Sequence, residues 1–205
     1  MDVQKKLAIF ISGKGSNAKN IVHFFHASPD VKVQFVFSSK ENIEMATFCA
    51  LHNTDFFTVT NQIVPDVFQI ELCLKYDIDW IVLAGYLKKV NTELIKCVNF
   101  KIINLHPSLL PKFGGQGMYG KNVHKAVIAN KETHSGITIH LVSDAFDDGR
   151  ILRQYTCEIQ ENETILTLEN KIHVLEQRYF PSAIAAIIKD YDVSTSDSSK
   201  HFPNQ

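Results

Sequence analysis

The sequence predicts an α/β fold, with an open, mostly parallel, twisted sheet, helices on both faces and an antiparallel C-terminal extension. Two observations predict this class. Short apolar runs of strand length alternate with helical patterns over the first half of the chain, and no linker separates them. Two more strand-like segments then follow around an acidic turn near residue 147. With 205 residues, 45% of them hydrophobic, the chain is long enough for one compact domain, which excludes a disordered or fibrous protein.

The first half of the chain begins with Leu-Ala-Ile-Phe-Ile inside residues 6–12, a run typical of a strand buried on both faces. Glycines at 13 and 15 end this strand, and a helix with an apolar side at residues 21–25 follows. A strand at 31–37 completes a strand–helix–strand unit. The same alternation predicts a helix at 43–51, a strand at 56–59, a helix from 65 to 76 and a strand at 80–84.

The second half starts with a short helix at 92–97 and a strand at 101–106, which Pro107 ends because proline cannot donate to the ladder. Glycine-rich residues 114–120 predict an active-site loop. A helix at 122–129 and an antiparallel strand pair at 136–142 and 151–159 follow. The last pattern, at 164–189, predicts a helix that Pro181 kinks or divides.

These elements together predict a single Rossmann-like domain over residues 1–189. Residues 190–205 are rich in Ser, Asp and Asn and have few apolar side chains. We therefore expect them to form a polar, poorly ordered tail.

The charge of the chain is nearly balanced, with 21 Lys and Arg against 22 Asp and Glu. A net charge of -1 gives no broad surface for nucleic acid or an anionic membrane. Because no apolar run approaches the roughly 20 residues of a membrane span and no signal peptide is evident, we expect a cytoplasmic protein with small-molecule substrates, as a monomer or homodimer. The four scattered cysteines and the absence of an HExxH pattern predict that no metal is bound.

A glycine-rich turn, Ser-Gly-Lys-Gly-Ser-Asn at residues 12–17, lies between the first predicted strand and helix. Glycines let a ligand approach the backbone, and a helix N-terminus attracts anions, so this turn predicts a phosphate site. It matches neither a Walker loop nor a GxGxxG dinucleotide loop. The alternative is a tight turn that binds nothing.

Asn104 and His106 stand two residues apart at the end of a predicted strand, so their side chains lie on one face. Open α/β sheets bind ligands at the carboxyl ends of their strands. An amide beside an imidazole suits a developing oxyanion and a proton transfer. The alternative is a polar pair whose hydrogen bonds are satisfied under a loop.

Three aspartates, Asp144, Asp147 and Asp148, crowd the acidic turn. A carboxylate near His106 would favour the imidazolium and hold one tautomer, but the sequence alone does not choose among the three. The alternative is a solvated turn. His140 is either a core histidine or a group that lies behind the reacting residues.

The segment Ile-Asn-Leu-His-Pro-Ser-Leu-Leu-Pro at residues 103–111 resembles the signature of the folate-dependent formyltransferases, with His140 and Asp147-Asp148-Gly149 following at a similar distance. Gly15-Ser16-Asn17, the Leu-Ala-Gly-Tyr segment at 83–86 and Glu176 ahead of Pro181 resemble the members that act on phosphoribosylglycinamide. The similarity extends to about residue 189.

The resemblance implies transfer of a formyl group from 10-formyltetrahydrofolate, as co-substrate, to the glycyl amine of 5-phosphoribosylglycinamide, the third step of purine synthesis. It implies that Asn104 polarises the formyl oxygen, His106 moves protons and Asp147 holds His106 charged and ordered. The implied binding residues are Gly15, Ser16, Asn17, His173 and Glu176 for the ribotide, and Leu87, Lys88, Lys89, Val90, Asn104, Ser143, Asp144, Ala145, Phe146 and Asp147 for the folate.

The chain departs from the commoner family pattern at three places. The loop at 114–120 is longer and richer in glycine than is common. Lys88 stands where arginine is frequent, and no arginine occurs between residues 31 and 102 to grip the glutamate tail of a folate. Asp148 replaces a small residue and adds charge near the expected folate ring.

Other users of formyltetrahydrofolate share the Asn, His and Asp pattern. The chain length argues against methionyl-tRNA formyltransferase and formyltetrahydrofolate deformylase, which carry additional domains. A formyltransferase for an amino-sugar nucleotide stays open, as does a non-catalytic module that binds a phosphate ligand.

Overall fold

A computed structural model of the chain describes residues 4–59, 65–96 and 101–198. The strands of this described part form one seven-stranded sheet in the order β3-β2-β1-β4-β5-β6-β7. Neighbours from β3 to β5 pair in parallel, whereas β6 and β7 are added antiparallel. The predicted fold class is therefore confirmed. The strands are β1 Lys5–Ile11, β2 Val31–Ser38, β3 Asp55–Thr58, β4 Trp80–Leu83, β5 Lys101–His106, β6 His134–Leu141 and β7 Ile151–Glu158.

Helices cover both faces of the sheet. Along β1, Leu7 and Ile9 belong to one apolar cluster while Ala8 and Phe10 belong to another, because successive side chains of a strand point to opposite faces. The first cluster includes side chains of α1 (Ser16–Phe25), α2 (Ile43–Leu51), α5 (Lys121–Ala129) and α6 (Ile165–Ser198). The second includes side chains of α3 (Pro65–Lys75) and α4 (Thr92–Lys96).

The strand order reverses beside β1. The chain builds β2 and β3 on one side of β1, then crosses to build β4 and β5 on the other side. Loops after neighbouring parallel strands therefore diverge at the carboxyl edge, where open α/β sheets bind their ligands.

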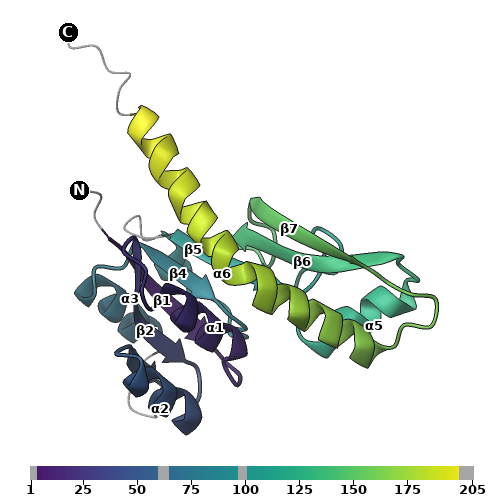
Figure 1. Cartoon of the computed structure of the whole chain (residues 1–205), viewed down its shortest axis with the longest axis horizontal. Coiled ribbons are helices and arrows are strands. Elements are labelled where there is room, and N and C mark those ends of the chain that lie inside the picture. Colours follow the sequence, from purple (N-terminus) through teal and green to yellow (C-terminus); the bar gives the residue numbers. More distant parts are fainter. Residues whose placement is uncertain (1–3, 60–64, 97–100, 199–205) are drawn as a thin grey trace.

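Helix α6 is not divided at Pro181, because it is one element with Pro181 inside it. Proline has no amide N–H, so the carbonyl four residues earlier, that of Gln177, loses its usual donor. The side-chain amide of Asn20, on α1, donates to this carbonyl at 2.7 Å. Figure 1 shows α6 running past α1 and continuing beyond the sheet.

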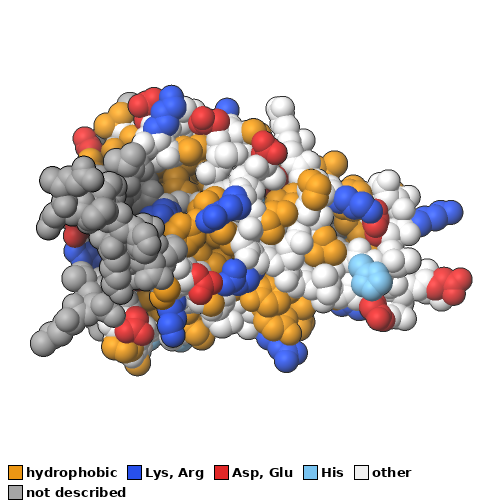
Figure 2. Space-filling view, turned by 90° about the horizontal axis from the view of Figure 1, so that it is seen from above, with side chains coloured by type: hydrophobic (Ala, Val, Ile, Leu, Met, Phe, Trp, Pro, Cys, Tyr) orange, Lys and Arg blue, Asp and Glu red, His pale blue; other side chains and the backbone are white. Residues whose placement is uncertain are grey.

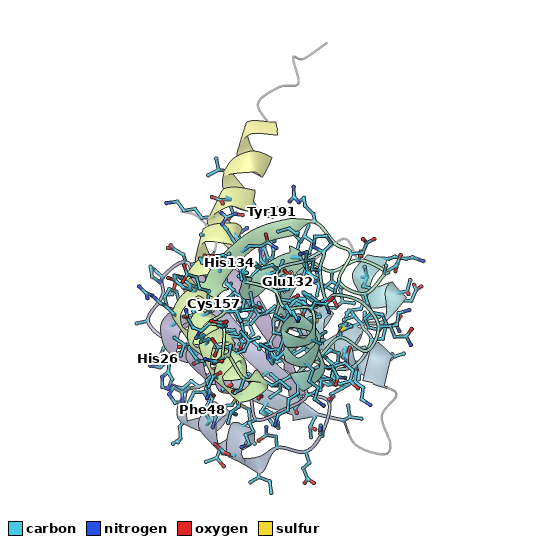
Figure 3. The ribbon with its side chains drawn as sticks, turned by 90° about the vertical axis from the view of Figure 1, so that its right-hand side faces the viewer. His26, Phe48, Glu132, His134, Cys157 and Tyr191 are labelled. Atoms are coloured by element: carbon cyan, nitrogen blue, oxygen red, sulfur yellow. The ribbon has the colours of Figure 1, made fainter. Side chains whose placement is uncertain are left out.

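The C-terminal segment also differs from the expected tail, since α6 continues to Ser198 while residues 199–205 lie outside the described part. Its first residues are anchored to the sheet. Asp192 forms a 2.9 Å ion pair with Lys5. The ring of Tyr191, which is labelled in Figure 3, lies 5.1 Å from that of Trp80. These contacts extend the helix where composition alone predicts disorder.

The surface carries mixed charge. On the face shown in Figure 2, basic and acidic side chains are interspersed among apolar ones. No described helix is long and apolar enough to cross a membrane.

Candidate active site

A cavity of about 930 Å³ opens at the carboxyl edge of the sheet. Its wall includes Gly13 after β1, Gly85 after β4 and Asn104 at the end of β5. Residues of the glycine-rich loop after β5, the turn between β6 and β7, and α6 also line it. The cavity therefore lies where the strand order reverses.

His106 is almost fully enclosed in this site, with a relative exposure of 3%. Its Nε2 lies 2.8 Å from the carbonyl oxygen of Phe113, and its Nδ1 lies 3.4 Å from Oδ2 of Asp147. Both ring nitrogens face oxygen acceptors. A protonated imidazole would thus find an acceptor for each N–H.

Asp147 is the aspartate of the acidic turn that reaches inward, whereas Asp144 and Asp148 are exposed. Its φ of 55° is unusual for a residue with a side chain, and the Gly115 N–H donates to Oδ2 at 2.9 Å. Burial alone would raise the pKa of Asp147, but its contact with His106 and the Gly115 hydrogen bond hold that pKa well below its usual value. The carboxyl group is therefore ionised at neutral pH.

Asn104 is held by His140, its cross-strand neighbour between β5 and β6. His140 Nδ1 lies 2.8 Å from the carbonyl oxygen of Leu141, which assigns the proton of the neutral ring to Nδ1. Its Nε2 then accepts from Asn104 Nδ2 at 3.1 Å, and the same Nδ2 lies 3.4 Å from Asp147 Oδ1. His140 thus sets which way the Asn104 amide points.

The turn that carries Asp147 closes through Gly149. A Cβ built on Gly149 would lie 1.6 Å from the carbonyl oxygen of Leu141, so no other residue fits without moving the backbone. This close approach ties the end of the turn to β6.

At one end of the cavity, α1 begins at Ser16 without a side-chain cap. Gly15, before it, has a φ of 79°, which glycine adopts without strain. The amides of the first turn of α1 are an anion-binding arrangement. Ser16 and Asn17 line the cavity, whereas Gly15 packs against Met45 and Ile11.

The Asn17 side chain joins α1 to α6. Its Nδ2 donates to Glu176 Oε2 at 2.9 Å, and its Oδ1 accepts from Gln177 Nε2 at 2.6 Å. Burial raises the pKa of Glu176, although the hydrogen bond from Asn17 and the nearby His173, at 3.6 Å, oppose that shift. Glu176 and His173 both line the cavity.

At the other end, the segment after β4 and the acidic turn face each other across the cavity. The Leu87 N–H donates to Ser12 Oγ at 2.9 Å, which ties this segment to the end of β1. Lys89 Nζ lies 5.9 Å from the centre of the Phe146 ring, a cation–π distance.

Apart from Gly15, every site residue expected from the sequence lies on the cavity wall, namely Ser16, Asn17, Leu87, Lys88, Lys89, Val90, Asn104, His106, His140, Ser143, Asp144, Ala145, Phe146, Asp147, His173 and Glu176.

His124, which no sequence pattern indicated, lies on α5 and lines the same cavity. It is 4% exposed, and its Nδ1 has no hydrogen-bond partner among the described residues. Burial lowers the pKa of His124, which favours the neutral ring. The signal that could have identified it is a histidine in the first turn of a helix directly after the glycine-rich loop.

Metal ligation has no candidate in the described part of the chain, where no group of three or more His, Cys, Asp or Glu residues could hold an ion. The groups that can do chemistry in the cavity are the buried His106–Asp147 pair and the Asn104–His140 pair.

Residues 5–184 of the chain match the formyl transferase family. The chain is 33% identical to phosphoribosylglycinamide formyltransferase of Bacillus subtilis, over 90% of this chain and 95% of that protein. It is 32% identical to the chloroplastic enzyme of that name from Arabidopsis thaliana, over 91% of this chain and 66% of that protein. The crystal structure of phosphoribosylglycinamide formyltransferase from Bacillus halodurans superposes with a TM-score of 0.78 at 28% identity, covering 90% of this chain and 95% of that one. The chain therefore belongs to the formyl transferase family.

Proposed function

We propose that this chain transfers the formyl group of 10-formyltetrahydrofolate to the glycyl amine of 5-phosphoribosylglycinamide, giving formylglycinamide ribotide and tetrahydrofolate. One observation carries the proposal: the Asn104, His106 and Asp147 cluster shares its cavity with the Ser16–Asn17 helix start and Glu176. The names of the relatives from Bacillus subtilis and Arabidopsis thaliana support the same reaction. We assign the activity to the domain over residues 1–189.

The reaction needs one proton to move. The amine nitrogen attacks the formyl carbon and forms a C–N bond, which gives a tetrahedral intermediate with a developing oxyanion. Collapse of this intermediate breaks the bond between the formyl carbon and N10 of the folate. The amine proton must finally reach N10, and His106, with Asp147 beside it, is the group positioned to carry it.

Asn104 supplies the donor for the oxyanion. Both hydrogens of its Nδ2 face acceptors in the ligand-free arrangement, His140 Nε2 at 3.1 Å and Asp147 Oδ1 at 3.4 Å. We expect a formyl oxygen to replace the longer contact, because that hydrogen bond is the weaker one. His140 would keep the amide oriented during this exchange.

The two substrates would enter from opposite ends. The phosphate would bind at the start of α1, with Glu176 and His173 near the ribose and amine, while the folate would lie between residues 87–90 and 143–147. The amine and formyl carbon then meet beside His106. This arrangement supplies the proximity on which group transfer depends.

The test is a direct assay. We expect the purified chain, given 10-formyl-folate and glycinamide ribotide, to consume the formyl donor as followed by absorbance, and His106→Asn to abolish turnover. No consumption by the folded, unaltered chain would overturn the proposal. Turnover only with an amino-sugar nucleotide would identify the alternative transferase, and ribotide binding without turnover would identify a binding module.

Cytoplasmic location and a monomeric or homodimeric state stay predictions. Light scattering during size-exclusion chromatography would decide the second.

A further inference from the structure

We propose that Asn20 is a positioning residue for the ribotide end of the cavity. It supplies the hydrogen bond that Pro181 removes from α6, and so holds Glu176 and Gln177 against Asn17. The identity of the ligand rests on the proposed function, whereas the hydrogen bond does not.

Pro181 creates the need for an external donor. It lies inside α6 and has no backbone N–H to donate to the carbonyl of Gln177. Pro181 is buried and Gln177 is half-buried, so leaving this carbonyl unpaired would be costly. Asn20 Nδ2 donates to it at 2.7 Å, a full-strength hydrogen bond from the neighbouring helix.

Side chains on the same face of α1 also hydrogen-bond to the residues of α6 that precede Pro181. Asn17 and Asn20 are three residues apart and therefore neighbours on one side of α1. Asn17 contacts the side chains of Glu176 and Gln177 at 2.9 and 2.6 Å, while Asn20 contacts the Gln177 backbone. Three hydrogen bonds thus fix two consecutive residues of α6 against α1.

Only part of this junction lines the cavity. Asn17 and Glu176 line the cavity, whereas Asn20 is outside its wall. Any effect of Asn20 on the ribotide must therefore pass through the placement of α6. The folate end, formed by residues 87–90 and 143–147, has no contact with this junction among the hydrogen bonds of the described residues.

The first measurement is a comparison of Michaelis constants. We expect Asn20→Ala to raise KM for the ribotide by about five- to thirtyfold, since a shift of about an ångström in a binding group is enough for such losses. KM for the folate and kcat should change less than about twofold. Asn20→Asp, matched in size but without the N–H donor, should behave like Asn20→Ala or worse.

Second-site rescue separates positioning from general damage. Pro181→Ala restores a backbone N–H that donates to Gln177 within α6, so Asn20→Ala combined with Pro181→Ala should return KM for the ribotide to within about threefold of the unaltered value. A normal KM in Asn20→Ala, or an equal rise in the presence and absence of Pro181→Ala, would overturn the proposal.

Thermal unfolding tests the hydrogen bond without any ligand. Asn20→Ala should lower Tm by about 2–4 °C in the Pro181 background and by clearly less in the Pro181→Ala background. Equal losses in both backgrounds would show that the two positions are not coupled. Because this cycle needs no turnover, failure of the proposed reaction in the unaltered chain is distinguishable from failure of the Asn20 bond.

Discussion

At the scale of single residues, the proposed chemistry depends on burying one histidine and one carboxylate together. His106 and Asp147 come from β5 and from the turn between β6 and β7, 41 positions apart in sequence, and their atoms approach to 3.4 Å. Desolvation alone would raise the pKa of Asp147, yet its hydrogen-bonding partners keep the carboxyl ionised. The carboxylate can therefore support positive charge on His106.

Asp147→Asn tests this support. Removing the negative charge beside His106 should lower kcat by about 100-fold or more, within the range of roughly 10²- to 10⁴-fold for acid–base catalysis. If the protonated imidazole assists the reaction, the fall of activity at high pH should move to lower pH, because the charged ring loses its partner. If neutral His106 is the base, the acid limb should move instead.

The measurement is the pH profile of kcat and of kcat/KM from pH 5 to 9, since the substrate amine contributes its own titration near pH 8. Asp144→Asn and Asp148→Asn are matched controls, because both aspartates are exposed on the same turn. Near-normal rates for Asp147→Asn with an inactive control variant would show that another carboxylate supports the histidine.

Asn17→Ala tests the ribotide end. The Asn17 side-chain amide hydrogen-bonds to Glu176 and Gln177, both of which lie on α6. The variant should raise KM for the ribotide by about tenfold to a hundredfold, the equivalent of about 1.5 to 3 kcal/mol for a hydrogen bond to a charged group. KM for the folate should barely change, and a fall in kcat at constant KM would contradict this role.

Residue-level inference from sequence succeeded where spacing alone sets geometry. Asn104 and His106 share a strand face because of the two-residue period, and both line the cavity. Asp147, and not Asp144, points toward His106 because the backbone at Asp147 has a positive φ, which the local sequence pattern does not predict. His124 was missed because its position depends on how α5 packs over the cavity.

At the scale of elements, glycine allows the acidic turn to close. Gly149→Ala should destabilise the fold by more than about 3 kcal/mol or displace the turn, since its Cβ would overlap the Leu141 carbonyl oxygen at 1.6 Å. Displacement would also carry Asp147 away from His106. We therefore expect loss of activity together with a lower Tm.

Gly13→Ala is the matched control for stability, because a Cβ at Gly13 meets no atom within 4 Å. Its Tm should stay within a few degrees of the unaltered chain. A Gly149→Ala variant with normal Tm and normal activity would show that the turn tolerates the extra atom by moving.

Predicted and observed elements agree best where apolar patterns are uninterrupted. Helix α2 and strand β5 occupy the expected residues, Ile43–Leu51 and Lys101–His106. Helix α6 continues beyond its expected end, where Tyr191 contacts Trp80 on β4 and Asp192 pairs with Lys5 on β1. Composition alone does not predict such tertiary contacts. It also tolerates Pro181 because α1 supplies a donor.

At the scale of the whole molecule, the cavity contains two carboxyl groups whose pKa values are shifted in opposite directions. Asp147 has a lowered pKa in the folded chain, so it contributes stability above its unfolded value of about 3.9, and that contribution is lost as pH falls below it. Glu176 has a raised pKa, so its contribution is present below about 4.3 and is lost as pH rises through the folded value. Near neutral pH, the ionised Glu176 side chain therefore lowers the free energy of unfolding.

Glu176→Gln tests this loss of stability. The glutamine amide keeps an oxygen that accepts from Asn17 Nδ2, but it cannot ionise. We therefore expect the variant to be more stable than the unaltered chain at pH 7 by about 1 kcal/mol, which corresponds to a Tm higher by about 2–4 °C. The difference should shrink steadily as pH falls toward 4, because the unaltered carboxyl becomes mostly protonated in both the folded and the unfolded state. Thermal unfolding from pH 4 to 8 measures this slope, and a constant difference across that range would contradict it. Ribotide binding should weaken in the same variant, because the buried carboxylate that destabilises the folded chain is also expected to contact the ribotide.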